Sequence, residues 1–382
     1  MRSTLATIPT FYMSTDPGNR TTVGARRDAD GKNEVVKIFP SFVYEVNLQD
    51  HLRHKEGTSK SNDETDNILT YNGKSFYYGE RAMQQGTLAD DARGAGGRYW
   101  SLHNFILILG MIVELLQEPK NSLENLGAFD PQSNTYEAEV KLGTGMPVSV
   151  YSPQRADLVR TTFSGVHKFS CNGKNYILHL SIGPVIMEGV GGLLLYGGTS
   201  TKRRFCIDGG YWSTEFVTMQ GPEFIEENSG GFPIGIGLAF DAIKKSVATT
   251  FGRELDEDEA QALLLAQARH EELPIISLYD KPLPPKELSV HTKNALDSYG
   301  IPMQQRLVSK LSSAAGLVAT NIEPALYIGG AAYYAMHFAQ AKIPNIRTVP
   351  DPEKVNARTY CLMATRYKQW EKIPVVEGSI VE

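Results

Sequence analysis

Hydrophobic and polar positions alternate over much of the first half of the chain, and this pattern predicts strands. The alternation covers residues 11–44 and again residues 68–82, where Asn72-Gly73 is typical of a hairpin turn. The polar stretch His51–Asn67 between them is expected to form an exposed loop. The apolar run Phe105–Val113 instead predicts a buried core helix.

In the middle of the chain the strand pattern returns around one inserted helix. Residues 137–145 and 146–152 are expected to be strands, and residues 153–165 a helix. Two further strands, joined through Asn172-Gly173, are expected over residues 166–187.

The second half of the chain places its apolar residues at helical spacing. Helices are expected over residues 234–251 and 290–320, and residues 325–339 predict a strand, a glycine turn and a helix. Asp256 and Glu259 have the spacing of a helix N-cap pair and not that of a calcium loop. Because strands and helices alternate in both halves, the sequence predicts an α/β fold.

Composition narrows the range of functions. A chain of 382 residues suggests about two to three domains, and its net charge of −5 gives no electrostatic reason for direct nucleic-acid binding. The three cysteines lie far apart and offer neither a disulfide framework nor zinc-ligand spacing. The N-terminal residues lack the apolar core of a signal peptide, and the longest apolar run is too short for a bilayer. We therefore expect a cytoplasmic protein without a membrane partner.

A short acidic and glycine-rich motif occurs once in each half of the chain. Asp16–Thr22 reads DPGNRTT and Asp208–Thr214 reads DGGYWST, each after an apolar stretch. A tight turn uses Asp and Gly for backbone reasons alone. A phosphate site uses the same residues, because glycine lets backbone N–H groups approach the oxygens while the acid holds a metal. The repetition favours two hairpins around one anionic ligand, with Asp16 and Asp208 near a hydrated Mg²⁺.

A third candidate segment is the apolar stretch Ala325–Ile328, which runs into Gly329, Gly330 and Ala331. Small residues at this point let a flat base or ribose lie against the backbone. The same pattern is also typical of an ordinary strand-to-helix turn in an α/β protein.

In their order and spacing these segments resemble the actin superfamily of ATPases, and within it the bacterial actin-like proteins related to the plasmid-segregation actin ParM. The resemblance covers nearly the whole chain. The segments that carry it are residues 14–22, 71–82, 143–151, 186–192, 206–216, 326–332 and 356–364.

The resemblance implies an α/β fold of the actin, Hsp70 and sugar-kinase superfamily, with two domains and a nucleotide cleft between them. Domain I would comprise residues 1–197 and 346–382, and domain II residues 198–345. The bound nucleotide would be ATP, with GTP as the alternative, together with Mg²⁺.

The resemblance also implies roles for individual residues. Asp16 and Asp208 would organise the metal and its waters, with Asp208 also catalytic, and Glu188 would orient the water that attacks the γ-phosphate. The residues that would wrap the phosphates or face the adenosine are Gly18, Asn19, Arg20, Thr21, Gly210, Tyr211, Trp212, Ser213, Gly329, Gly330 and Ala331.

Three positions depart from the pattern of the family. Val23 stands where many relatives carry a phosphate-contacting Lys, Thr359 stands where a Gly is frequent, and Trp212 is bulky for a phosphate turn. These departures bear on the rate of hydrolysis more than on nucleotide binding.

The function implied by the resemblance is that of an ATP-hydrolysing filament protein of a prokaryotic cytoplasm. Identical subunits would join head to tail, hydrolysis would control filament dynamics, and a DNA-binding adaptor would attach plasmid DNA for segregation. Two alternatives stay open. One is a non-filamentous small-molecule kinase or ATPase of the same superfamily, and the other is a structural filament that binds nucleotide with little turnover.

Overall fold

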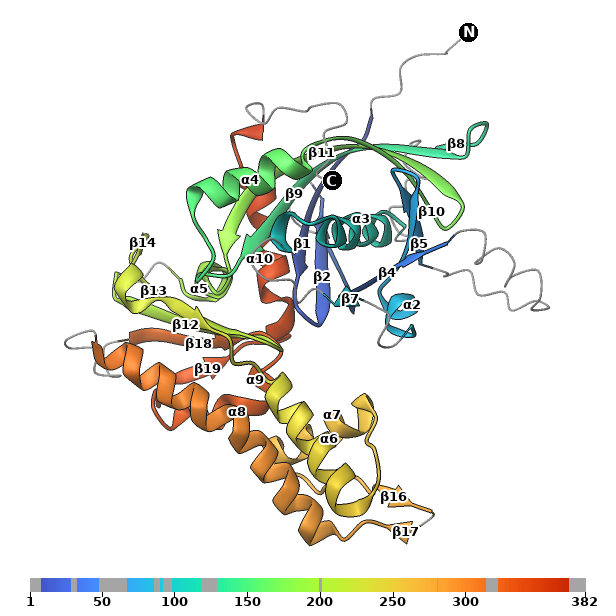
Figure 1. Ribbon diagram of the computed structural model, residues 1–382. Helices are drawn as coiled ribbons and strands as arrows, with labels where there is room; N and C mark the ends of the chain where they lie inside the picture. The colour runs from blue at the N-terminus through green and yellow to red at the C-terminus, as the bar shows by residue number, and fades with distance from the viewer. Residues whose placement is uncertain are drawn as a thin grey trace. The chain divides into compact units, whose positions relative to one another are not determined.

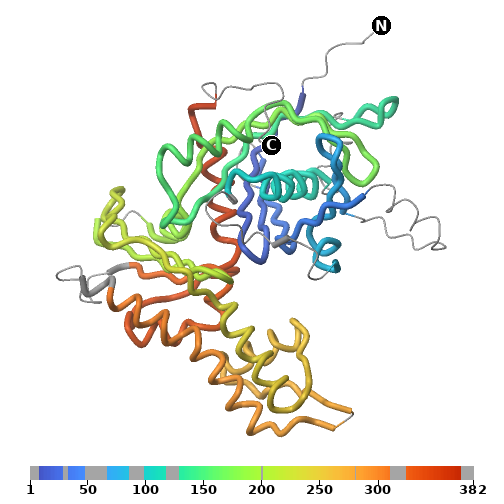
Figure 2. The backbone as a smooth tube through the Cα atoms, in the orientation of Figure 1, coloured from blue at the N-terminus to red at the C-terminus, as the bar shows by residue number. Residues whose placement is uncertain are grey.

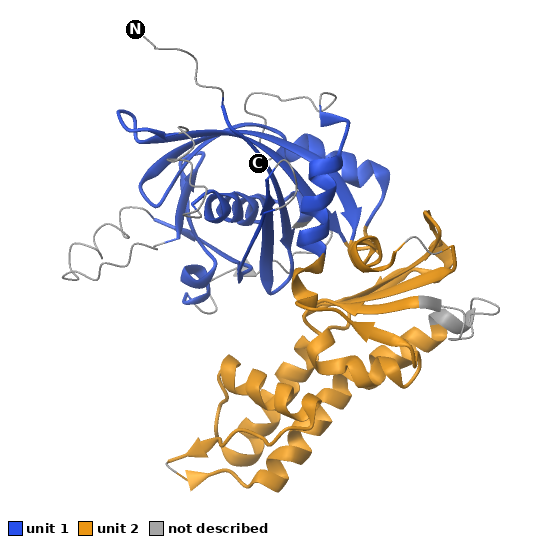
Figure 3. Cartoon of the chain, turned by 180° about the vertical axis from the view of Figure 1, so that it is seen from behind, with its two compact units in different colours: residues 1–146, 151–187, 356–382 blue, residues 147–150, 188–355 orange. Residues whose placement is uncertain are grey.

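Two compact units make up the chain (Figure 3). The computed structural model describes residues 8–28, 33–47, 67–85, 90–91, 98–117, 129–198, 201–279, 281–313 and 322–370. Unit 1 comprises Met1–Met146, Tyr151–Met187 and Asn356–Glu382, and unit 2 comprises Pro147–Val150 and Glu188–Val355. The domain boundaries expected after residues 197 and 345 both fall inside unit 2. The expected loop His51–Asn67 lies, except for Asn67, outside the described residues.

Unit 1 is built on a large mixed sheet with the strand order β3-β2-β1-β9-β11-β10-β5-β6-β4-β7, and β8 pairs with β9 (Figure 1). Its centre is parallel, because β9 pairs in parallel with both β1 and β11. The strands are β1 (Thr10–Pro17), β2 (Thr21–Arg27), β3 (Glu34–Pro40), β4 (Phe42–Val46), β5 (Ile68–Tyr71), β6 (Lys74–Tyr78), β7 (Asp90–Asp91), β8 (Phe129–Asp130), β9 (Thr135–Met146), β10 (Gly165–Cys171) and β11 (Lys174–Met187).

The turn signals in unit 1 are confirmed. Asn72-Gly73 joins β5 to β6 and Asn172-Gly173 joins β10 to β11, and all four residues have positive φ, as a tight hairpin turn requires. The strand expected over residues 146–152 is wrong, because β9 ends at Met146 and a turn follows. Pro147 has no N–H to donate to a strand ladder, and the N–H of Ser149 donates to the Glu215 carboxylate instead of to a neighbouring strand.

The helices of unit 1 include the expected core helix α3 (Leu102–Leu116), whose N-cap is the Ser101 hydroxyl and whose apolar run is buried. The expected helix after residue 153 is also confirmed, as α4 (Pro153–Phe163). The described residues of unit 1 also include the helices α2 (Glu80–Met83) and α10 (Val355–Arg366), which begins at the last residue of unit 2.

Unit 2 has a smaller sheet with the order β14-β13-β12-β18-β19, in which β15 also pairs with β13, and a separate two-stranded ribbon of β16 and β17. Its strands are β12 (Arg203–Gly209), β13 (Thr214–Gln220), β14 (Glu223–Phe224), β15 (Gly230–Phe232), β16 (Ser277–Leu278), β17 (Lys281–Pro282), β18 (Ile322–Ile328) and β19 (Ile346–Thr348). Its helices are α5 (Val190–Tyr196), α6 (Gly237–Phe251), α7 (Glu257–Arg269), α8 (Pro285–Ser313) and α9 (Ala332–Gln340).

The helical half predicted from the sequence is confirmed in unit 2. Asp256 and Glu259 form a complete capping box at the start of α7, as their spacing predicts. The helix α8 has 29 residues. The backbone trace shows it in orange, running along unit 2 (Figure 2). It starts five residues before the expected Val290, and the expected end at residue 320 lies outside the described residues.

The two faces of the small sheet meet different helices, since side chains alternate along a strand. Phe205 and Ile207 of β12 belong to the core that also contains residues of α6, α8 and α9. Cys206 points to the other face, where a Cβ placed on Gly192 of α5 would lie 2.9 Å from its sulfur. Asp208, two residues after Cys206, therefore lies on the α5 face.

Within the described residues, no helix is both long and apolar enough to cross a bilayer.

Candidate functional site

The first predicted phosphate segment forms the turn between β1 and β2 in unit 1. Gly18 donates its N–H to the carbonyl of Asp16 at 2.9 Å, and a Cβ on Gly18 would stand only 2.7 Å from the carbonyl oxygen of Thr21. A side chain at this position would collide with the backbone, so the tight turn requires glycine. Asn19 and Arg20 are half-buried at its tip. The expected hairpin is therefore present.

Val23 pairs directly with Asp16 across this hairpin and is 3% exposed. Its side chain is packed and apolar, so this position adds no positive charge beside the acid. Arg20 is the cation that the turn itself carries, and its carbonyl accepts the N–H of Ser41 at 2.7 Å.

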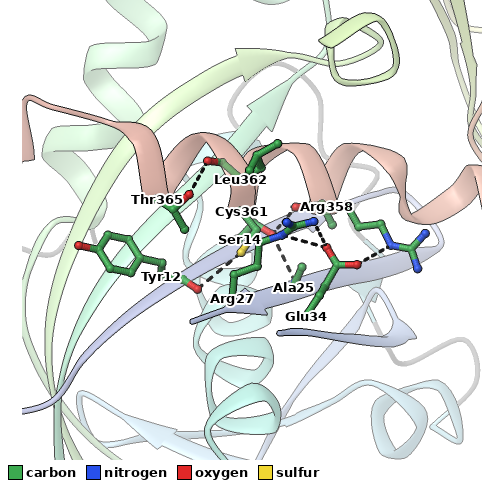
Figure 4. A network of polar contacts seen from close by, with 10 residues as sticks. Tyr12, Ser14, Ala25, Arg27, Glu34, Arg358, Cys361, Leu362 and Thr365 are labelled. Carbon is green, nitrogen blue, oxygen red and sulfur yellow. Dashed lines mark hydrogen bonds and ion pairs between the residues drawn. The ribbon is translucent and has the colours of Figure 1, made fainter. Parts of the chain in front are cut away.

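The strand β1, which leads to Asp16, is hydrogen-bonded to helix α10 (Figure 4). The Ser14 hydroxyl donates to the Ala357 carbonyl at 2.6 Å in the interior. Glu34 on β3 binds the Nε of Arg27 at 3.1 Å and the Nε of Arg358 on α10 at 3.1 Å. The segment that resembles the second connecting segment thus holds β1 by polar contacts. Thr359, in place of the frequent glycine, is buried within this helix.

The second predicted phosphate segment forms the turn between β12 and β13 in unit 2. Gly209 pairs with Thr214, and the N–H of Gly210 donates to the carbonyl of Ser213 at 2.8 Å. The carbonyl of Tyr211 accepts the N–H of Gly237 at 2.7 Å, which ties the turn to the start of α6. The Trp212 ring packs edge-on against the Tyr211 ring at 5.0 Å between centroids, so its bulk does not prevent the turn.

The predicted adenosine segment lies against this second turn. Ala331 donates its N–H to the Gly209 carbonyl at 2.9 Å, and Gly329 has a φ of +80°. A Cβ on Gly329 would come within 2.4 Å of the Gly209 oxygen and 2.5 Å of an Asp208 carboxylate oxygen. By contrast, no described atom lies within 4 Å of a Cβ placed on Gly330. The backbone at Gly330 therefore faces open space, one residue after the glycine that approaches Asp208, as binding of a flat nucleoside would require.

Glu188 is the first residue of its segment of unit 2 and is half-buried. The next residue, Gly189, has a φ of +82°, and a Cβ there would lie 3.7 Å from the Cβ of Asp208. Unit 2 therefore brings together Glu188, Asp208, the Gly210–Ser213 turn and the Gly329–Ala331 turn. Asp16 and the Gly18–Thr21 turn lie in unit 1.

Glu215 is a buried acid that the sequence patterns did not single out. It lies opposite Asp208 in the ladder and is 3% exposed. Its carboxylate accepts the backbone N–H of Ser149 at 3.0 Å and the Ser149 hydroxyl at 3.1 Å. Burial raises its pKa to about 7, although these hydrogen bonds lower it, and the negative charge of Asp208 also raises it. The signal that could have revealed it is an acid directly before the apolar pair Phe216-Val217 within a strand.

The donor set suits a magnesium nucleotide better than a metal bound by protein alone. Within the described residues, no three His, Cys, Asp or Glu side chains are grouped to hold a metal. Mg²⁺ usually keeps several waters and takes one or two carboxylates plus substrate phosphates, and each unit offers one candidate carboxylate, Asp16 in unit 1 and Asp208 in unit 2.

Comparison with solved structures gives the fold. No protein-family model and no curated protein matches the sequence. A crystal structure of an archaeal actin homologue superposes with a TM-score of 0.70 at 19% identity, covering 93% of this chain and 99% of that one. The chain has an actin-like fold. The predicted fold class, an actin-like α/β fold, is confirmed.

Other actin-like structures agree over a similar length. The 15-stranded ParM filament from Clostridium botulinum matches with a TM-score of 0.61 at 16% identity, over 94% of this chain and 100% of that one. The archaeal homologue in complex with ADP matches with a TM-score of 0.68 at 18% identity, over 94% of this chain and 100% of that one.

Proposed function

We propose that the chain is an ATP-dependent, self-assembling actin-like filament protein. The observation that supports this most is the convergence in unit 2 of Asp208, Glu188, the Gly210–Ser213 turn and the open backbone at Gly330. A metal-bound nucleotide needs three features from a protein surface. These are an acid for the metal, a glycine-containing turn for the phosphates and an uncovered backbone surface for the nucleoside. The similar structures, which include an ADP complex and filaments, support the same reading.

In this proposal each phosphate turn supplies backbone N–H groups to phosphate oxygens, and Arg20 adds the positive charge that Val23 lacks. Asp16 of unit 1 and Asp208 of unit 2 are the acids that would hold a magnesium ion through its waters, and the ion would neutralise negative charge on the phosphates. Glu188 accepts a hydrogen bond from the attacking water and so fixes its direction. ATP is the proposed nucleotide, and GTP is the alternative.

Subunits would assemble head to tail, because a contact between unlike surfaces that does not close on itself generates a helical filament. We further propose that a DNA-binding adaptor attaches plasmid DNA to the filament in a prokaryotic cytoplasm. A structural filament with little turnover is the second candidate, and the packed, apolar Val23 beside Asp16 favours it.

The test is to add ATP and Mg²⁺ to the purified protein and to follow light scattering and phosphate release in one sample, with negative-stain microscopy. Scattering that rises above a critical concentration and falls as phosphate appears is the expected result. Filaments without phosphate release would favour the structural filament. Phosphate release without filaments would contradict self-assembly and would call for a screen of small-molecule phosphate acceptors.

A further inference from the structure

A chain of three buried hydroxyl groups lies behind the second phosphate turn. The Thr214 hydroxyl on β13 is 2.8 Å from the carbonyl oxygen of Ile234 and 3.0 Å from the Tyr299 hydroxyl on α8. The Tyr299 hydroxyl is in turn 3.0 Å from the Tyr327 hydroxyl on β18. All three side chains are fully buried, so these contacts replace water as their hydrogen-bond partners.

The direction of every hydrogen bond in this chain follows from one atom. The Ile234 carbonyl can only accept a hydrogen bond, so the Thr214 hydroxyl must donate its single hydrogen to it. Tyr299 must therefore donate to Thr214, and Tyr327 must donate to Tyr299. Tyr299 is thus the central member, which donates to one neighbour and accepts from the other.

The two ends of the chain belong to the two nucleotide segments of unit 2. Thr214 closes the β12–β13 turn by pairing with Gly209. Tyr327 precedes the Gly329–Ala331 turn by two residues, and a Cβ on Gly209 would lie 2.9 Å from the Tyr327 hydroxyl. Substantial movement of one segment would therefore stretch or break a hydrogen bond that involves Tyr299.

The hydroxyl groups of both tyrosines stay protonated over the ordinary working range of pH. Burial is the main cause that raises the pKa of Tyr299 and of Tyr327 above the usual 10.0, and the negative charge of Asp208 contributes. The chain of donors therefore stays intact when the pH changes.

We infer that Tyr299 is a positioning residue for nucleotide binding, whose hydroxyl holds the second phosphate turn and the adenosine turn in one fixed arrangement. The inference rests on the proposed function and adds a residue of α8 that touches neither phosphate nor base. Preorganisation of two binding segments raises affinity because less ordering remains to be done when the ligand binds.

The test compares Tyr299→Phe with a matched variant, Tyr71→Phe. Tyr71 is also buried, and its hydroxyl lies 3.0 Å from the Nδ1 of His167 within unit 1. Each variant loses one buried hydroxyl, so both should lower thermal stability by a similar amount. The affinity for ATP-Mg²⁺, measured by calorimetry, should fall about tenfold in Tyr299→Phe and stay near wild type in Tyr71→Phe.

A second readout is hydrogen exchange in the protein without nucleotide. In Tyr299→Phe the amides of Gly210 and Ala331, one in each segment, should both lose protection. Tyr327→Phe should have a weaker effect, because it removes the first donor and leaves no hydroxyl hydrogen without an acceptor. This variant also serves if Tyr299→Phe fails to fold.

Equal ATP affinity in the Tyr299 and Tyr71 variants would overturn the inference, as would loss of protection confined to α8. If the wild-type protein bound no nucleotide, the proposed function would fail instead. The exchange of Gly210 and Ala331 would then still decide whether Tyr299 couples the two segments.

Discussion

Asp208 and Glu215 lie directly opposite each other on the antiparallel strands β12 and β13, and both are buried. Asp208 is the acid proposed to organise the metal, while Glu215 binds Ser149 through two hydrogen bonds. Gly231 lies so close that a Cβ there would be 2.1 Å from the Glu215 carboxylate. The Glu215 carboxyl group is thus held by its own partners, in a site with little access to water.

The burial of Glu215 makes the stability of the protein depend on pH. Its pKa is about 7 in the folded state and near the ordinary 4.5 when unfolded, so between these values the folded state holds more protons. The free energy of unfolding should therefore fall as the pH rises from 4.5 to about 7 and lose nothing further above that range. Glu215→Gln cannot ionise. From pH about 5 to pH about 8 it should gain up to about 3 kcal/mol relative to wild type.

Urea denaturation of the protein without nucleotide or metal measures this difference. The matched control is Glu223→Gln, which changes an exposed acid on the neighbouring strand β14 and should follow the wild-type profile. Parallel pH profiles for wild type and Glu215→Gln would show that Glu215 does not change its protonation on folding.

Loss of the Asp208 carboxylate should affect the ligand more than the fold. Asp208→Ala should weaken Mg²⁺-dependent ATP binding about ten- to a hundredfold, because a hydrogen bond to a charged group contributes about 1.5–3 kcal/mol. Calorimetry with and without Mg²⁺ measures the effect, and circular dichroism checks the fold. Asp241→Ala, which removes an exposed acid on α6, is the control. If ATP bound equally well to both variants, Asp208 would have no part in the site.

Removal of the Glu188 carboxylate should separate binding from hydrolysis. Glu188→Ala should keep its ATP affinity, release phosphate about a hundredfold more slowly and form longer-lived filaments, since a positioned acid or base contributes at least that factor. Phosphate release and the decay of scattering are followed together. Glu226→Ala, at an exposed acid of the same unit, is the control. Unchanged hydrolysis in Glu188→Ala would remove Glu188 from the mechanism.

Features that depend on neighbouring residues could be predicted from the sequence, and the structure confirms several of them. Asn72-Gly73 fixes its hairpin because these two residues tolerate positive φ, and Asp256 with Glu259 starts α7 because both act on nearby N–H groups. The strand expected at residues 146–152 failed for the opposite reason. Ser149 turns away from the sheet to meet Glu215, which lies 66 residues farther along the chain.

Parts of the candidate site depend on the same kind of distant contact. The motif that begins at Asp208 predicted the hairpin turn between β12 and β13, because the local order of Asp, Gly and Thr defines it. Tyr299 reaches Thr214 across 85 residues from the buried face of a long helix, where a tyrosine is indistinguishable by pattern from any core residue. Sequence periodicity gives the face of an element but not its partner.

Two adjacent glycines offer a test of the adenosine site that separates strain from ligand contact. Gly329→Ala should destabilise the protein by about 1–3 kcal/mol or more, because φ is +80° and the new methyl group would meet the backbone of Gly209. Gly330→Ala places its methyl group where no described atom lies within 4 Å, so stability should be unchanged. If the nucleoside lies on this backbone, ATP affinity in Gly330→Ala should nevertheless fall about tenfold, since added atoms in a packed contact cost about 1–3 kcal/mol. Thermal unfolding and calorimetry on both variants measure the two effects. A Gly330→Ala protein with wild-type stability and wild-type affinity would mean that the nucleoside binds elsewhere.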